Sequence, residues 1–434
     1  CRHETLLTTP SDYAKQATYI RPSVEKRLAA TTLHGRKPTG KPNNVLGSDS
    51  TLEISPTTFP APLVLPGDDL ALDPRCPPQS VRAWSRLKER NDVTEDRRTL
   101  YVVAPPDIDD DIKEVSSWCQ IQRTSSGDDI ELPRAEDVID YLSAFYHGIP
   151  VKRLPFKVRF VAWDTTSPKK YIGLDIGGGE CVRIRTRRLP SRDGSTQPFA
   201  RQLNLDDLLD AAIGMLPDAA YALLLLVTHD LYEDADDEFV CGRAYGGSRV
   251  AVVSSARYHP ALDVESGLAS ARAHAWPASH CAEYVRACCD AEVQPRPRKR
   301  AHTTTTEAAG SLAHAAGALH AAVAAHRTIS SLDVPHASSA ALTGLWLGRV
   351  CRTASHELGH CFGLDHCVYY ACVMQGSASL IEDARQPPYL CPVDLTKVLR
   401  VLSTTAESRY SALLAFCERH ADIHLFAALA AWLR

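Results

Sequence analysis

The distribution of apolar and polar positions divides the chain near residue 99. Residues 1–95 are rich in Pro, Thr and Ser and contain few periodic segments, so we expect an N-terminal arm that is partly ordered. Within the arm, residues 80–90 have the spacing of a helix. From residue 99 onward, short apolar runs alternate with segments in which apolar residues recur at helical spacing.

The chain after residue 99 predicts a core of the α/β or α+β class with a mixed sheet, because strands alternate with helices. We assign residues 96–289 to the first part of this core and residues 331–434 to the second. Strand composition is found in 99–105, 156–163, 171–177, 180–187, 221–232, 239–247 and 248–258. Helical spacing is found in 135–148, 203–216 and 342–354.

Residues 290–330 interrupt this pattern and are interpreted as a low-complexity insertion, flexible first and weakly helical afterwards. Its basic run, residues 296–300, is more typical of a solvated linker than of a nuclear localisation signal. Three histidines follow at intervals of six residues, which places them on different faces of a helix. We therefore predict no metal site from His314, His320 and His326.

Composition excludes several classes of partner. A net charge of −4 and a pI near 6.5 give no reason to expect nucleic acid. No run approaches the roughly 18 apolar residues of a membrane span, and the first residues lack the pattern of a secretory signal. We therefore expect a cytoplasmic protein, with the nucleus as a second location. Its 14 cysteines should then be free thiols or metal ligands. The sequence does not indicate an oligomeric state.

The strongest chemical signal is the segment HELGHCFGLDH, which begins at His356. Because His356 and His360 are four residues apart on a predicted helix, both imidazoles can reach one ion. Glu357 is close enough to act on a metal-bound water without being a ligand. Gly363 permits a sharp turn that returns His366 as a third ligand. Three protein ligands leave a position open, as in catalytic zinc sites.

The motif continues beyond the third histidine. Cys367 follows at once, then Cys372 and Met374, and later Cys391 and Asp394. This arrangement resembles the archaemetzincins, a family of metzincin zinc peptidases with the pattern HExxHxxGxxHC, four residues, CxM, about seventeen residues, then CxxC. Chance would give the histidine pattern alone on the order of once in ten thousand sequences of this composition.

The resemblance extends loosely over residues 99–270 and 335–434. It implies an α+β fold with a metzincin core, in which a mixed twisted sheet is joined by an active-site helix and a mostly helical C-terminal subdomain. It also implies that Met374 is the Met-turn residue, an apolar floor beneath the zinc histidines. A second, structural zinc held by four cysteines is implied as well, and here the fourth position is Asp394.

The second site is therefore open to several interpretations. A carboxylate can ligate zinc, so a Cys₃Asp site formed by Cys367, Cys372, Cys391 and Asp394 is chemically possible. Alternatively, Cys361 or Cys417 completes the site, or the site has lost its metal.

We expect hydrolysis of peptide bonds by zinc-activated water, with Glu357 as the general base and a peptide or protein as substrate. The alternative is a zinc-binding scaffold or interaction protein with little turnover. Residues 248–258, an apolar β-branched run, are predicted to be either an edge strand that pairs with an extended substrate or an internal core strand.

Overall fold

The computed structural model describes most of the chain in eight stretches. They are residues 3, 5–37, 54–122, 130–163, 170–188, 197–291, 317–329 and 337–434. The basic run at 296–300 and His314 lie outside these stretches, so the predictions made for them have no structural counterpart here.

A five-stranded mixed sheet forms the centre of the fold, as the alternating pattern predicted. Its strands lie in the order β10 (Gly242–Tyr245), β11 (Val250–Ser254), β8 (Ala220–Val227), β1 (Thr99–Val103) and β3 (Val151–Arg153). All neighbours are parallel except β10, which runs antiparallel to β11. Every residue of β8 is buried, which explains its continuous apolar sequence, AYALLLLV.

A second sheet lies beside the first. The sequence pattern predicted one mixed sheet and did not distinguish the two. Its order is β2 (Asp107–Ile108), β4 (Arg159–Val161), β5 (Tyr171–Gly177), β6 (Glu180–Arg187), β7 (Gln202–Asn204) and β9 (Asp230–Tyr232). An apolar cluster fills the space between the two sheets and contains Leu174, Ile184, Leu208, Leu223 and Val252.

The described helices fall into three groups along the chain. Those of the arm are α1 (Tyr13–Gln16), α2 (Val24–Ala30), α3 (Asp69–Leu72) and α4 (Val81–Trp84). Those of the middle are α5 (Ala135–Phe145), α6 (Leu205–Gly214), α7 (Leu268–Ala271), α8 (Ala282–Ala291) and α9 (Ala318–Ile329). Those of the C-terminal part are α10 (Ser339–Cys361), α11 (Leu380–Arg385), α12 (Pro392–Leu402), α13 (Ala406–Arg419) and α14 (His424–Leu433). None of the described helices is both long and apolar enough to cross a membrane.

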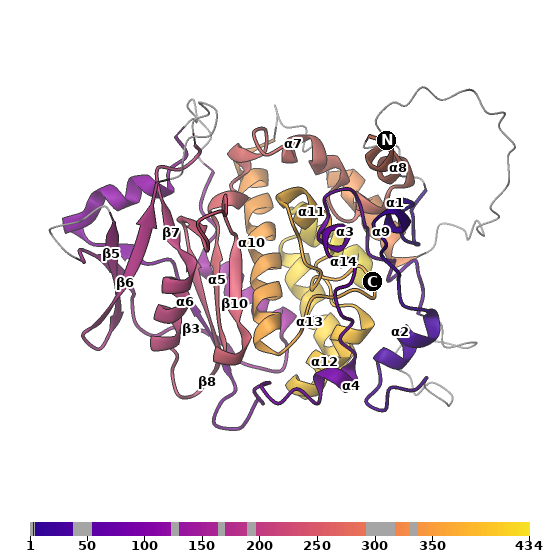
Figure 1. Cartoon of the computed structure of the whole chain (residues 1–434), viewed down its shortest axis with the longest axis horizontal. Helices are drawn as coiled ribbons and strands as arrows, with labels where there is room; N and C mark the ends of the chain where they lie inside the picture. The colour runs from indigo at the N-terminus through magenta and orange to yellow at the C-terminus, as the bar shows by residue number, and fades with distance from the viewer. Residues whose placement is uncertain are drawn as a thin grey trace, which may run out of the picture.

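Helix α10 lies between the five-stranded sheet and the C-terminal helices (Figure 1). Its first turn is capped by the Ser338 hydroxyl, which accepts a hydrogen bond from the Ala341 N–H. One face of the helix packs against β11 and β10, and another packs against α5 and α14. This burial on several sides explains why the helix contains few charged residues.

Of the two alternatives for residues 248–258, the free edge was wrong and the internal strand is confirmed. Strand β11 pairs with β8 on one side and with β10 on the other, so it is an internal strand. The strand at this edge of the sheet is β10, which is followed directly by the glycine turn Gly246–Ser248. Both segments have strand composition, and composition does not specify which of two consecutive strands lies outside.

The arm packs on the C-terminal half of the chain. In Figure 1 its indigo segments lie beside the yellow C-terminal helices, and α4 contacts α12. Of the insertion predicted at 290–330, residues 290–291 belong to the end of α8, and α9 packs along α14. Segments separated by most of the chain length are therefore neighbours in space.

Candidate metal centre

His356 and His360 lie one turn apart near the C-terminal end of α10. Their Nε2 atoms face each other at 3.1 Å. Each Nδ1 is 2.7 Å from a backbone carbonyl, that of Val373 for His356 and that of Leu364 for His360. A carbonyl only accepts, so each Nδ1 carries the proton and donates it, which leaves the Nε2 lone pair available to a metal.

The helix ends immediately after these histidines. Gly363 adopts φ +76°, and its N–H donates to His360 O while the Leu364 N–H donates to Gly359 O. This pair of bonds is a Schellman ending, which requires a left-handed residue after the helix and favours glycine. The turn directs His366 back toward the helix, with ring-centroid distances of 5.4 Å to His356 and 5.2 Å to His360.

The outer side of His366 faces the arm. A Cβ added to Gly376 would lie 2.8 Å from His366 Nδ1 and 2.2 Å from Asp69 Oδ2, so both atoms converge on this glycine. Glycine is the residue that leaves them room. The Asp69 carboxylate, from α3, is thereby placed near the imidazole of the third histidine, where carboxylates commonly orient metal ligands.

The three histidines fit a zinc ion. One ring nitrogen from each can be chosen so that all three lie within 4.8 Å of one another. A tetrahedral ion with zinc–nitrogen distances of about 2.0–2.1 Å separates its ligands by about 3.3 Å, close to the 3.1 Å between the two Nε2 atoms. Burial lowers the pKa of His360 to about 4 and that of His356 well below its usual range, which favours the neutral, metal-binding form.

Glu357 lies beside the histidines in a cleft of about 600 Å³. Its residue is 7% exposed, and its Cγ would lie 3.3 Å from a Cβ added to Gly242 of β10. Burial raises the pKa of this carboxyl to about 8, with Asp383 adding to the shift and Arg243 opposing it. A zinc ion at the histidines would oppose this shift, because a nearby cation favours the charged carboxylate.

Met374 lies directly beneath the histidine-bearing helix. The side chain is completely buried, and its Sδ would lie 2.4 Å from a Cβ added to Gly359. Gly359, between the two histidines, therefore allows the thioether to approach the helix backbone. The role of an apolar floor, which the resemblance implies for Met374, stays a prediction.

A second cluster gathers the residues predicted for a structural metal. The Sγ atoms of Cys367 and Cys391 are 3.5 Å apart, and Asp394 Oδ2 is 3.4 Å from Cys372 Sγ and 3.3 Å from Cys391 Sγ. All four residues are buried. With a zinc–sulfur distance of about 2.3 Å, tetrahedral thiolates stand about 3.8 Å apart, so the cluster has nearly the required size.

The other two cysteines considered for this site lie elsewhere. Among the described residues, Cys361 and Cys417 are not part of either group that could hold a metal. Asp394 is the fourth member of the cluster instead. Its second oxygen, Oδ1, accepts a hydrogen bond of 2.8 Å from Lys397 Nζ, and both residues are 1% exposed.

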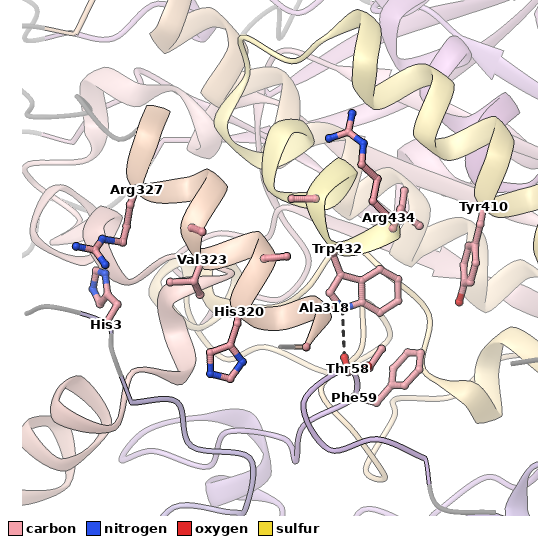
Figure 2. A pocket seen from close by; sticks show the side chains of 15 residues that line it. His3, Thr58, Phe59, Ala318, His320, Val323, Arg327, Tyr410, Trp432 and Arg434 are labelled. Carbon is pink, nitrogen blue, oxygen red and sulfur yellow. Dashed lines mark hydrogen bonds between the residues drawn. The ribbon is translucent and has the colours of Figure 1, made fainter. Parts of the chain in front are cut away.

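A larger hollow lies away from the histidines, between α9 and α14. Its volume is about 1010 Å³, and its walls include Trp432, Phe59 and Val323. Figure 2 shows the Trp432 indole directed at Thr58, whose carbonyl accepts its N–H at 3.2 Å. No group of three possible metal ligands among the described residues lies here, so this hollow does not offer the chemistry of the cleft.

Some residues of the site were missed from the sequence. Asp69 and Gln79 come from the arm, where no periodic or motif signal pointed to them. Lys397 follows Asp394 by three residues on α12, a spacing that places opposite charges side by side on a helix. That spacing could have identified the pair.

Comparison with known proteins finds similarity that is strongest in the C-terminal part of the chain. Residues 336–400 match the sequence model of Peptidase family M54. Archaemetzincin-2 of Homo sapiens is 45% identical over 73 residues, which are 17% of this chain and 20% of that protein. Archaemetzincin-1 of Mus musculus is 27% identical over 227 residues, which are 52% of this chain and 35% of that protein. The match thus spans a fifth to about a third of these relatives' length.

A solved archaemetzincin from Methanopyrus kandleri aligns with 71% of this chain and 98% of its own, at 19% identity and a TM-score of 0.31. The archaemetzincin resemblance inferred from the sequence is confirmed by the family match and by the curated relatives.

Proposed function

We propose that this chain is a zinc-dependent metallopeptidase that hydrolyses peptide bonds in the cleft beneath β10. The observation that carries the proposal is that the Nε2 atoms of His356 and His360 lie 3.1 Å apart, while the Nδ1 of each ring is hydrogen-bonded to a backbone carbonyl. His366 supplies a third ligand and Glu357 a carboxyl beside them. Three histidines and one buried carboxyl on an open cleft are the elements that metal-assisted hydrolysis requires.

The roles of the residues follow from their chemistry. Zinc bound to the histidines would supply a Lewis acid for the scissile carbonyl and lower the pKa of water. Glu357 takes a proton from the attacking water and later delivers it to the leaving amine. The carbonyls of Val373 and Leu364 fix the tautomers of two histidines. Met374 supports the helix from below.

An extended peptide would bind by pairing with β10. The Ser254 N–H donates to Cys241 O at 2.8 Å, and antiparallel ladders alternate, so the N–H and C=O of Gly242 and Ala244 point to the other edge. Among the described strands none pairs with that edge. Gly242 and Ala244 also line the cleft, and strand addition at such an edge is a common way to hold a peptide.

The variant Ala244→Pro tests this pairing. Proline removes one N–H from the outer edge of β10, so we expect KM to rise by about 2- to 10-fold, the equivalent of one net hydrogen bond of about 0.5–1.5 kcal/mol. Zinc content should be unchanged. Steady-state kinetics on a cleaved peptide provide the measurement, and Ala244→Ser, which keeps the N–H, is the matched control. A KM equal in both variants contradicts the pairing.

A peptide-library cleavage assay, combined with metal analysis, tests the function itself. We expect zinc in the purified protein and cleavage that stops after chelation and returns with zinc. A protein that holds zinc at the histidines but cleaves no peptide would instead be a zinc-binding scaffold.

We also propose a structural zinc in the cysteine cluster, with Asp394 as the fourth ligand. Cys₃Asp and Cys₄ both supply four anionic ligands, and Lys397 offsets part of the excess negative charge. An oxygen ligand gains less covalency with zinc than a thiolate, so this site should bind more weakly than Cys₄.

Zinc per chain is the measurement for Asp394. We expect two zinc ions in the parent, two in Asp394→Cys and fewer in Asp394→Ala, because alanine supplies no ligand. One zinc in all three proteins would mean that the cluster holds no metal.

A further inference from the structure

Gln79, in the arm, uses its whole amide group in bonds to the metal region. Its Nε2 donates to Gly363 O at 2.9 Å and to Asp365 Oδ2 at 2.8 Å. Its Oε1 accepts from Lys397 Nζ at 2.6 Å and from the Asp365 N–H at 3.3 Å. The residue is 6% exposed. A primary amide has two donors and two acceptor sites, so this side chain is fully satisfied.

These bonds enclose the turn that orients two histidines. Gln79 holds the residues on either side of Leu364, and the Leu364 carbonyl accepts from His360 Nδ1. His366 is the next residue after Asp365. One side chain from the arm therefore fixes both the carbonyl that sets the tautomer of the second histidine and the backbone that presents the third.

The same amide also reaches the cysteine cluster. Lys397 Nζ lies between Gln79 Oε1 and Asp394 Oδ1, at 2.6 Å and 2.8 Å. Asp394 Oδ2 faces Cys372 Sγ and Cys391 Sγ. Lys397 and Asp394 are each 1% exposed, so water does not compete for these bonds. An unbroken chain of polar contacts thus joins the thiols to the histidine turn.

We propose that Gln79 is a positioning residue that couples the two sites, so that metal in the cysteine cluster strengthens metal binding at the histidines. Metal held by Asp394 Oδ2 fixes the carboxylate, and the carboxylate fixes Lys397 and through it the amide. The turn from Gly363 to Asp365, which Gln79 contacts at both ends, then has less freedom to move. This inference rests on the proposed metal sites, and the coupling must be reciprocal because it is a difference of binding free energies.

The first test is the zinc affinity of the histidine site, measured by chelator competition. Gln79→Met keeps the size of the side chain and removes all four bonds. We expect the affinity to fall by about 10- to 100-fold, as when a residue that orients a ligand is lost. Gln16→Met, at an exposed glutamine of the same arm, is the control and should bind as the parent does. Equal affinities in the two variants overturn the proposal.

A second variant separates the donor side of the Gln79 amide from its acceptor side. It also tests whether the cysteine cluster stays folded. Gln79→Glu keeps the acceptor for Lys397 but has no donor for Gly363 O, and it places a carboxylate beside Asp365. We expect weaker histidine-site binding, while the thiolate-to-cobalt absorption of the cobalt-loaded cysteine cluster is retained. Parent-like affinity in this variant contradicts the role of the amide.

A double-mutant cycle distinguishes coupling from simple structural support. In Cys372→Ser, which weakens the cluster, Gln79→Met should reduce histidine-site affinity much less than it does in the parent. Purely additive effects would show that the two sites are independent. None of these measurements needs activity, so a parent that binds zinc without cleaving peptides would overturn the proposed function and leave this test intact.

Discussion

Replacing Glu357 with glutamine is expected to reduce peptide hydrolysis by about 10²–10⁴-fold, the usual effect of losing a general base. Glutamine has nearly the same size and a polar end, but it cannot accept a proton from water. Because Glu357 is not a ligand, zinc content should remain near that of the parent. The measurement is kcat on a cleaved peptide together with zinc per chain.

The control for this variant is Glu114→Gln. Glu114 is an exposed carboxylate in the 3₁₀ helix Asp110–Cys119, so the exchange removes one charge and leaves the cleft unchanged. Its turnover should equal that of the parent. Unchanged turnover in Glu357→Gln would refute the assignment of the base, whereas loss of zinc in that variant would indicate damage to the histidine site.

Replacing His360 with alanine is expected to abolish activity and to empty the histidine site. This residue contributes one Nε2 of the converging pair, and its loss should exceed the roughly 10–100-fold weakening caused by losing an outer partner. Zinc in the cysteine cluster should remain, so the zinc content falls from two ions to one. His34→Ala, at an exposed histidine, is the control. Retained activity in His360→Ala would rule out the ligand set.

The pH dependence of the parent should follow the same chemistry. An imidazole binds metal through a ring nitrogen that carries no proton, so protons compete with zinc for that nitrogen as the pH falls. Activity and zinc occupancy should therefore decrease together on acidification. A constant occupancy with falling activity would assign the pH effect to another group.

The histidine site could be predicted from the sequence because its information is local. His356 and His360 are four positions apart on one helix, and Gly363 ends that helix so that His366 returns. The cysteine cluster was accessible through its spacing in the same way. Such patterns depend on helix geometry and on a single turn, which short segments determine by themselves.

Other parts depended on contacts between distant segments and were not predicted. Strand composition identified β10 and β11 as strands but could not decide which of them is the edge, because the neighbours of a strand in a sheet are determined by packing. The sequence around Gln79 contains no motif or periodic pattern that would predict a role for this residue. Its importance arises from Lys397 and Gly363, which lie 318 and 284 residues away.

The position of the arm also affects the order in which the protein can fold during synthesis. Ribosomes produce the N-terminal end first, but the partners of Gln79 are made only when translation has passed Lys397. Contacts between such remote positions form late, because a long loop must close before they contribute. Until then, the Gln79 region of the arm lacks the C-terminal segments that it contacts in the folded protein. The turn that presents His366 therefore gains its contact with Gln79 only after the segment that contains both candidate metal sites has been synthesised.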